Sequence, residues 1–368
     1  MNQMTPATQA QQDADYIRMI GSALDTALVQ ATRQETHERV TSIDVASARY
    51  VIFSDLHKGA RNGADDFQIA EQTYNAALAY YFEMGHTLVC LGDVEELWEE
   101  QAGSALKAYE HTIALEAQFH QQGRYWRFWG NHDDDWRYTD AVQKHLVPRY
   151  GGQPLKVREC LSLKVTAGAQ ELGSILLLHG HQGTLESDRF AGISKLFVRY
   201  GWRNFQRLTK ISLNTPAKNW EIRERHNRAM YSWTEKQKKL VLIAGHTHRP
   251  VFKSRSHPTK IREELHDLED KLTRTPGDAQ LREKAALLSA ELEWVLSQEQ
   301  QRPGQEGLQP MSKPCYFNTG CCCFLDGDIT GLEITGGEFR LVRWPDNEGA
   351  PKPQILESAK INDVFAAC

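Results

Sequence analysis

The chain has 368 residues and a formal net charge of −5. This length allows one large α/β domain with insertions or two domains of ordinary size. A membrane-spanning helix is excluded because no window approaches the run of about 18 apolar residues that it requires, and the polar N-terminal segment lacks the apolar core of a secretory signal. Seven cysteines, three of them consecutive at 321–323, do not fit a disulfide framework. We therefore expect a cytoplasmic protein.

Residues 1–45 are a polar leader that we expect to hold one amphipathic helix. Ile17, Ile20, Leu24 and Leu28 recur at helical spacing, which gives the helix one apolar stripe. We expect this helix to pack on the rest of the chain and to take no part in chemistry.

Short apolar runs alternate with helical stretches from Arg49 onward, the pattern of buried strands in an α/β sheet protein. The clearest predicted strands are Tyr50–Phe53, Thr87–Leu91, Tyr125–Trp129, Ile175–Leu178 and Leu240–Ala244. Polar segments follow these runs at once: SDLHKG, GDVEELWE, GNHDDD, HGHQG and GHTHRP. Because loops at the carboxyl ends of strands meet in one crevice, we expect these segments to build one site.

Taken singly, these motifs are weak signals. Asp55 and His57 lie two residues apart and can reach one ion from a strand exit, but such a pair is common by chance. Asp93 could equally cap a helix at 94–100, and a lone histidine is more often structural. The occurrence of all the motifs in this order at strand ends favours a metal site.

The order D-x-H, G-D, G-N-H, H and G-H-x-H resembles the signature of the calcineurin-like metallophosphoesterases, over residues 55–248. The resemblance implies two packed β-sheets flanked by helices, and two divalent ions that share Asp93. The first ion would be held by Asp55, His57, Asp93 and His248, and the second by Asp93, Asn131, His179 and His246. Carboxylate, amide and imidazole ligands suit manganese, with iron or zinc as alternatives.

The resemblance also implies in-line attack of a water molecule on phosphorus. His132 is then the candidate general acid for the leaving oxygen. Asp133 could orient His132 by a hydrogen bond, or it could cap a helix that begins near Trp136.

Within this family, GDVEELWE and GNHD differ from the G-D-x-x-D-R-G and G-N-H-E of the Ser/Thr protein phosphatases. The chain is more similar to the UDP-2,3-diacylglucosamine hydrolases. They share a G-D-x-x-E-x-W segment, an acid several residues after the H-G motif (Asp188 here), a basic helical insertion and GHTHRP. This similarity implies cleavage of the diphosphate in a nucleotide-linked lipid.

A basic helical insertion is expected at 187–239, where lysine and arginine outnumber the acids despite the acidic net charge. Arg199 and Arg203, interleaved with aromatic residues, are candidate substrate-binding residues together with Asp188. The insertion could be a lid over acyl chains and diphosphate, could touch the inner face of a membrane, or could bind single-stranded nucleic acid, which we favour least. A cap helix with a solvated basic face explains the same pattern.

After the last motif, leucines at helical spacing on both sides of a Pro-Gly break predict a helical hairpin insertion at 258–300. Residues 315–318, 329–335 and 338–344 are predicted strands of a second sheet, and they complete a metallophosphoesterase domain at 46–345. Residues 346–368 are expected to be a loosely held tail. Cys321, Cys322 and Cys323 would alternate faces in an extended segment, so we do not expect the three thiols to bind one ion.

The leading hypothesis is a two-metal hydrolase of phosphodiester or diphosphate bonds that acts on a nucleotide-linked or lipid-linked substrate. A nuclease or a cyclic-nucleotide phosphodiesterase is the alternative enzyme, because the same two-metal centre supports both. A binding module that keeps the fold without the chemistry is disfavoured, because every ligand position is filled.

Overall fold

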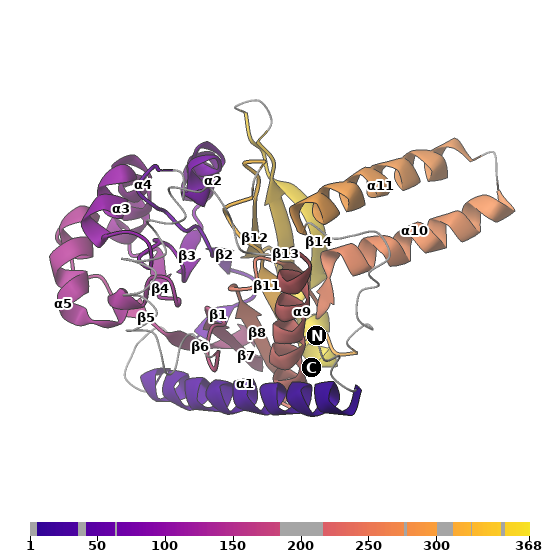
Figure 1. Ribbon diagram of the computed structural model, residues 1–368, viewed down its shortest axis with the longest axis horizontal. Coiled ribbons are helices and arrows are strands. Elements are labelled where there is room, and N and C mark those ends of the chain that lie inside the picture. Colours follow the sequence, from indigo (N-terminus) through magenta and orange to yellow (C-terminus); the bar gives the residue numbers. More distant parts are fainter. Residues whose placement is uncertain are drawn as a thin grey trace.

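The computed structural model describes residues 6–35, 42–62, 65–184, 216–275, 278–299, 312–324, 326–346 and 350–368. Within these ranges the chain forms two seven-stranded mixed sheets that pack face to face, with helices on their outer faces (Figure 1). This is the α/β arrangement of two packed sheets that the sequence predicts.

The first sheet contains the three strands that precede the first three polar motifs. Its order is β14 (Gln354–Lys360), β13 (Glu338–Trp344), β12 (Ile329–Thr335), β2 (Arg49–Phe53), β3 (Thr87–Leu91), β4 (Tyr125–Phe128) and β5 (Val157–Arg158). From β2 to β5 the strands are parallel, so their carboxyl ends lie at the same edge of the sheet.

The second sheet contains the two strands that precede the remaining motifs. Its order is β1 (Ser42–Asp44), β6 (Cys160–Ala167), β7 (Gln170–Leu178), β8 (Leu240–Ala244), β11 (Tyr316–Thr319), β9 (Pro250–Phe252) and β10 (Arg255–Ser256). The strands β7, β8 and β11 are parallel, so the loops after β7 and β8 also lie at one edge.

A continuous apolar layer fills the space between the sheets. Val89 and Leu91 of the first sheet meet Ile175 and Val241 of the second, and all four side chains are buried. The alternate residues of the same strands face the outer helices, because successive side chains of a strand point to opposite faces. These strands are therefore apolar on both sides, which explains why they read as continuous hydrophobic runs.

Helices cover both outer faces. Those that pack on the first sheet include α2 (Glu71–Glu83) and α4 (Glu110–Gln121), with the short α3 (Ala102–Ala108) and α5 (Thr139–Ala141) beside them. On the second sheet lie α1 (Pro6–Glu35) and α9 (Pro216–Thr234). In α1, Ile20 and Leu24 are fully buried, which confirms the predicted amphipathic helix.

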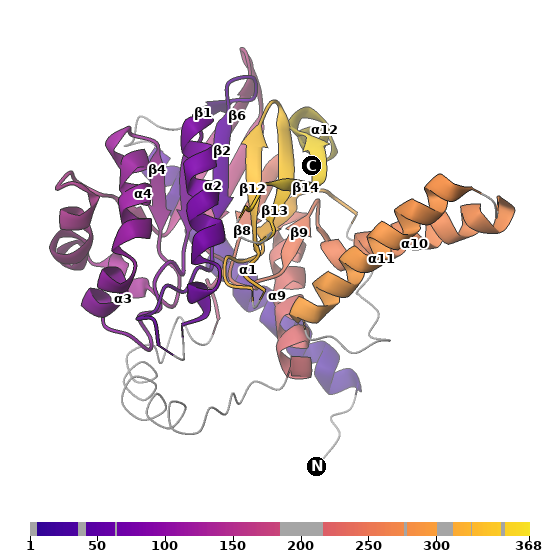
Figure 2. The same ribbon diagram turned by 90° about the horizontal axis from the view of Figure 1, so that it is seen from above.

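Two long helices, α10 (His257–Arg274) and α11 (Ala279–Glu299), occupy the region of the predicted hairpin. They lie side by side and project away from the sheets (Figure 1 and Figure 2). No helix in the described ranges is long and apolar enough to cross a membrane.

Two predictions at the C-terminal end are wrong. The strands expected to form a separate second sheet are divided, because β11 pairs with β8 whereas β12 pairs with β2. The expected loose tail is instead ordered structure: β14 extends the first sheet beside β13, and α12 (Ile361–Ala367) buries Ile361, Val364 and Phe365. The polar residues that precede β14 conceal this apolar triplet in the sequence.

Candidate active site

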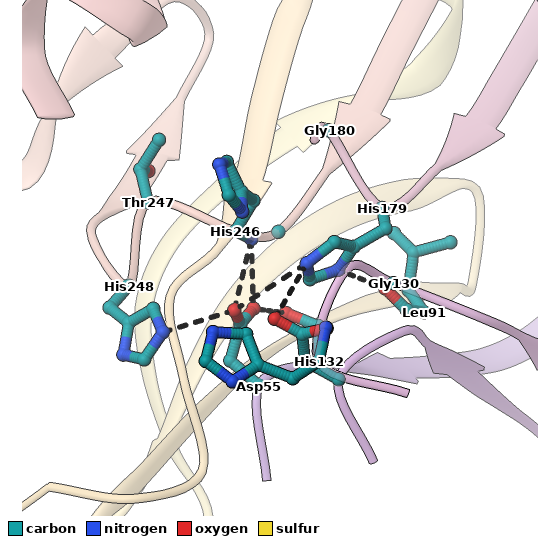
Figure 3. Close-up of polar contacts among 12 residues, drawn as sticks. Asp55, Leu91, Gly130, His132, His179, Gly180, His246, Thr247 and His248 are labelled. Atoms are coloured by element: carbon teal, nitrogen blue, oxygen red, sulfur yellow. Dashed lines mark hydrogen bonds and ion pairs between the residues drawn. The ribbon is translucent and has the colours of Figure 1, made fainter. Parts of the chain in front are cut away.

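The side chains predicted to bind metal come together where the carboxyl ends of both sheets meet. Asp55 and His57 follow β2, Asp93 follows β3 and Asn131 follows β4. The remaining three, His179, His246 and His248, follow β7 and β8 of the other sheet. Figure 3 shows His179 and His248 on either side of the Asp55 carboxylate.

Asp55, His57 and His248 form one compact group, in which one ligand atom of each lies within 4.8 Å of the others. The Nε2 atom of His248 lies 3.2 Å from Oδ1 of Asp55 and 3.2 Å from Nε2 of His57. Two imidazoles and a carboxylate that converge on one point are a typical divalent-cation site.

Asp93, His179 and His246 form a second group of the same kind. Nδ1 of His179 donates to the carbonyl oxygen of Leu91 at 2.8 Å, so its Nε2 atom faces the site and lies 3.0 Å from Oδ2 of Asp93. The same carboxylate oxygen lies 3.8 Å from Nε2 of His57 in the first group. Asp93 therefore stands between the two groups.

The donor atoms at the centre of the site fit a metal ion. The Oδ1 atom of Asn131 is buried and makes no hydrogen bond within the described part of the chain. A buried polar atom is costly when unsatisfied, and a cation would satisfy it. The residues present thus suit divalent ions held by oxygen and imidazole ligands.

The backbone at the site adopts an uncommon conformation. Asp55, His57, Asp93, His246 and His248 have φ values of 54°, 53°, 50°, 69° and 56°. The left-handed region is sparsely populated by residues other than glycine, and such strain concentrates at functional sites. Tight turns directly after the strands aim these side chains back into the crevice.

Two glycines of the motifs make room for the ligands. A Cβ atom on Gly130 would lie 2.2 Å from Oδ1 of Asp93, and one on Gly245 would lie 2.6 Å from Oδ2 of Asp55. A side chain at either position would displace a carboxylate. This explains glycine before Asn131 and before His246.

Glu96 and Trp98 hold His132 in the site. Oε2 of Glu96 accepts hydrogen bonds from Nδ1 of His132 at 2.7 Å and from Nδ1 of His57 at 3.0 Å. Trp98 stacks on His132 with ring centroids 4.4 Å apart and donates from Nε1 to the carbonyl oxygen of Asn131. Neither residue was singled out from the sequence, although both belong to the G-D-x-x-E-x-W segment.

Asp133 does not contact His132 in the way that the sequence suggested. Its carboxylate accepts hydrogen bonds from the backbone amides of Gly130, Asp93 and Val94, and it makes no side-chain cap to the short helix that follows. It thereby ties the loop after β4 to the loop after β3. The alternative role of Asp93 as a helix cap is also wrong, because residues 94–100 form a bridge and a turn.

Charge balance keeps the central acids ionised. Burial favours the neutral carboxyl of Asp93, but the charges of His179 and His132 outweigh burial and hold its pKa well below the ordinary value. Burial likewise opposes ionisation of Glu96, but His132 and His57 lower its pKa to about 2. Both carboxylates are anionic at neutral pH and available to cations.

Two of the three consecutive cysteines lie beside the first metal group. The sulfur atoms of Cys321 and Cys323 each lie within 4.8 Å of a ring nitrogen of His248, and Cys322 is fully buried.

The predicted substrate-binding residues Asp188, Arg199 and Arg203, with most of the basic insertion, lie outside the described residues.

Comparison with known proteins agrees with this geometry. The sequence model of the calcineurin-like phosphoesterase family matches residues 48–250, which include every residue of the two groups. No curated protein matches the sequence significantly.

Proposed function

Since the chain belongs to the calcineurin-like phosphoesterase family and is thus a metal-dependent hydrolase, we propose that it cleaves phosphodiester or diphosphate bonds with two divalent ions. The observation that carries this proposal is the position of Asp93. Its Oδ2 atom lies 3.0 Å from His179 and 3.8 Å from His57, so one carboxylate serves both groups.

In this proposal each ion has its own ligands in addition to Asp93. The first is held by Asp55, His57 and His248, and the second by Asn131, His179 and His246. Bound there, the ions would lower the pKa of a water molecule and neutralise charge on the phosphoryl oxygens. Manganese suits the mixed oxygen and nitrogen ligands, and iron or zinc could take the same places.

In this proposal His132 is the proton donor. Glu96 accepts from Nδ1 of His132, so the opposite nitrogen Nε2 is the atom that can hold a proton for the leaving oxygen. Burial disfavours the charged ring, but Glu96 and Asp93 outweigh burial and raise the pKa of His132. We assign His132 as general acid, Glu96 as the residue that positions it, and Asp133 as a support of the loop.

The substrate class rests on the sequence resemblance to UDP-2,3-diacylglucosamine hydrolases. Glu96 and Trp98, two residues of the shared segment, contact His132 and Asn131. A nucleotide-linked or lipid-linked diester or diphosphate is therefore our proposed substrate. Arg199 and Arg203 would bind its anionic part and Asp188 a hydroxyl or amide group, and the basic segment would bring the protein to the inner face of a membrane.

A substrate panel tests this function. Protein loaded with manganese is assayed on bis-p-nitrophenyl phosphate, p-nitrophenyl phosphate, a UDP-linked lipid and single-stranded DNA. We expect the diester and the UDP-linked lipid to be hydrolysed faster than the monoester. Preference for DNA would favour a nuclease, and no turnover of any substrate by fully loaded protein would favour a binding module.

A reversal of Arg199 and Arg203 to glutamate tests the basic segment. The double variant should raise KM for the UDP-linked lipid much more than for bis-p-nitrophenyl phosphate. Equal changes for both substrates would show that the two arginines do not recognise the lipid.

A further inference from the structure

A cavity of about 550 Å³ lies beside the candidate metal centre. One wall is the exposed face of α1 with Ser22, Thr26 and Gln30, and the facing wall includes Trp129 and Gln182. Asn131 is also part of the lining. The cavity therefore opens directly onto a residue that we assign to the second ion, and its size is that of a small-molecule pocket.

The N-terminal helix is fixed firmly enough to form such a wall. A Cβ atom on Gly183, in the loop after β7, would lie 3.0 Å from Cβ of Ala23 and 3.2 Å from the carbonyl oxygen of Met19. His226 of α9 also links α1 to this loop. Its ring nitrogens lie 2.8 Å from the hydroxyl of Tyr16 in α1 and 2.6 Å from the carbonyl oxygen of Gly180 in the loop. Thus α1 packs without a gap on the loop that carries His179.

Two buried side chains with polar groups, Gln182 and His181, belong to this lining. Gln182 is 6% exposed and His181 is 3% exposed. Nε2 of Gln182 and Nδ1 of His181 make no hydrogen bond to any described residue. Both residues line the cavity, but these two atoms are closed off from solvent. The polar groups that a ligand would meet are therefore those of Ser22, Thr26 and Gln30, which suit a ligand with hydroxyl groups.

The charges in the lining disfavour a second anionic group. Asp134 and Glu159 are acidic, and the basic residue Arg137 lies 3.6 Å from Asp134. An acyl chain is equally unsuited, because it would remove water from the hydroxyl of Ser22 and the amide of Gln30, which line the cavity. Trp129 offers a flat apolar face among these polar groups, a combination that suits a hydroxylated ring.

We propose that this cavity binds the uncharged, hydroxylated ring group, a sugar or a nucleoside, that is esterified to the phosphate at the metal centre. The proposal rests on the proposed function and names the part of the substrate that α1 recognises. Since α1 precedes residue 48, where the family match begins, this specificity belongs to a segment that the family model does not cover.

Two variants on the same helix test the proposal. Thr26→Trp would fill the cavity, whereas Val29→Trp changes a position that is 51% exposed and outside the lining. Each is assayed with the p-nitrophenyl ester of thymidine 5′-phosphate and with methyl p-nitrophenyl phosphate, which share a leaving group and differ in the ring. Thr26→Trp should raise KM for the thymidine ester about tenfold, the loss of roughly 1.4 kcal/mol of binding, and should leave the methyl ester unchanged.

Unchanged KM for both esters, or an equal rise for both, would overturn the proposal. Ser22→Trp is a second blocking variant, read in the same way, if Thr26→Trp lowers the melting temperature. Inhibition by thymidine 5′-phosphate compared with glucose 1-phosphate distinguishes a nucleoside from a sugar. If the wild type hydrolyses neither ester, the proposed function has failed, and the cavity is tested alone: Thr26→Trp should still weaken calorimetric binding of the preferred phosphate.

Discussion

Oε2 of Glu96 lies 2.7 Å from Nδ1 of His132, and the same oxygen accepts from His57. One carboxylate thus orients a proposed metal ligand and a proposed acid. Glu96→Gln should lower kcat about 10- to 100-fold and weaken metal binding, as is usual when a ligand loses the carboxylate behind it. Glu83→Gln, on the exposed end of α2, is the control. Equal activity and metal content in the two variants would contradict the role of Glu96 in orienting His57 and His132.

His132→Gln tests general acid catalysis by its dependence on the leaving group. Such catalysis contributes about 10²- to 10⁴-fold and matters most when the leaving group is poor. The variant should slow an alkyl or sugar phosphoester strongly and a nitrophenyl ester far less, with metal content near wild type. Equal slowing of both esters with metals retained would mean that His132 acts on phosphoryl charge and not as the acid.

Lys58 stabilises the loop that follows the first ligands. It is fully buried, and its Nζ atom lies 3.0 Å from Glu116 and 3.3 Å from Glu95. Lys58→Ala should lower the free energy of unfolding by about 3–5 kcal/mol, because it leaves the buried carboxylate of Glu116 without its cation and that of Glu95 with Arg127 alone. Lys107→Ala, at an exposed position of α3, should change it little. Urea unfolding measures the free energy of unfolding of both variants. If Lys58→Ala lost no more of it than Lys107→Ala, the stabilising role of Lys58 would be contradicted.

His86 should make the stability depend on pH. Burial and the nearby charge of Arg49 lower its pKa to about 4 in the folded chain, against about 6.5 in the unfolded chain. Folding favours the neutral ring. The contribution of His86 to the free energy of unfolding is therefore complete above pH 6.5 and is lost as the pH falls toward 4. His86→Gln should therefore lose less stability than the wild type between pH 7 and pH 5, measured by urea unfolding. An equal loss of unfolding free energy in the wild type and the variant would contradict this role of His86.

The core of the site could be predicted because each ligand follows directly on an apolar strand. Observed β3 and β8 have the predicted bounds, and a ligand's place relative to its strand end is a local property. The contact of Glu96 with His132 depends instead on how the chain turns after Asp93, which the pattern of residues 94–100 does not reveal. A helix was the plausible alternative there.

The wall that α1 contributes could not be predicted for a different reason. The apolar stripe of α1 shows that it packs, but the position is fixed by the close approach of Ala23 to Gly183, residues far apart in the sequence. The structure of the C-terminal segment could not be predicted for the same reason. Its strand β14 forms by pairing with β13, a contact that the segment's own sequence does not reveal.

The central claim is that two ions share the Asp93 carboxylate, and elemental analysis tests it most directly. Wild-type protein reconstituted with manganese should hold two ions per chain, as a two-metal centre requires. His248→Ala should lose the first ion and keep the second, whereas Asp93→Ala should lose both ions together with activity. If Asp93→Ala retained both ions and full activity, Asp93 would not bridge them and the account would be contradicted.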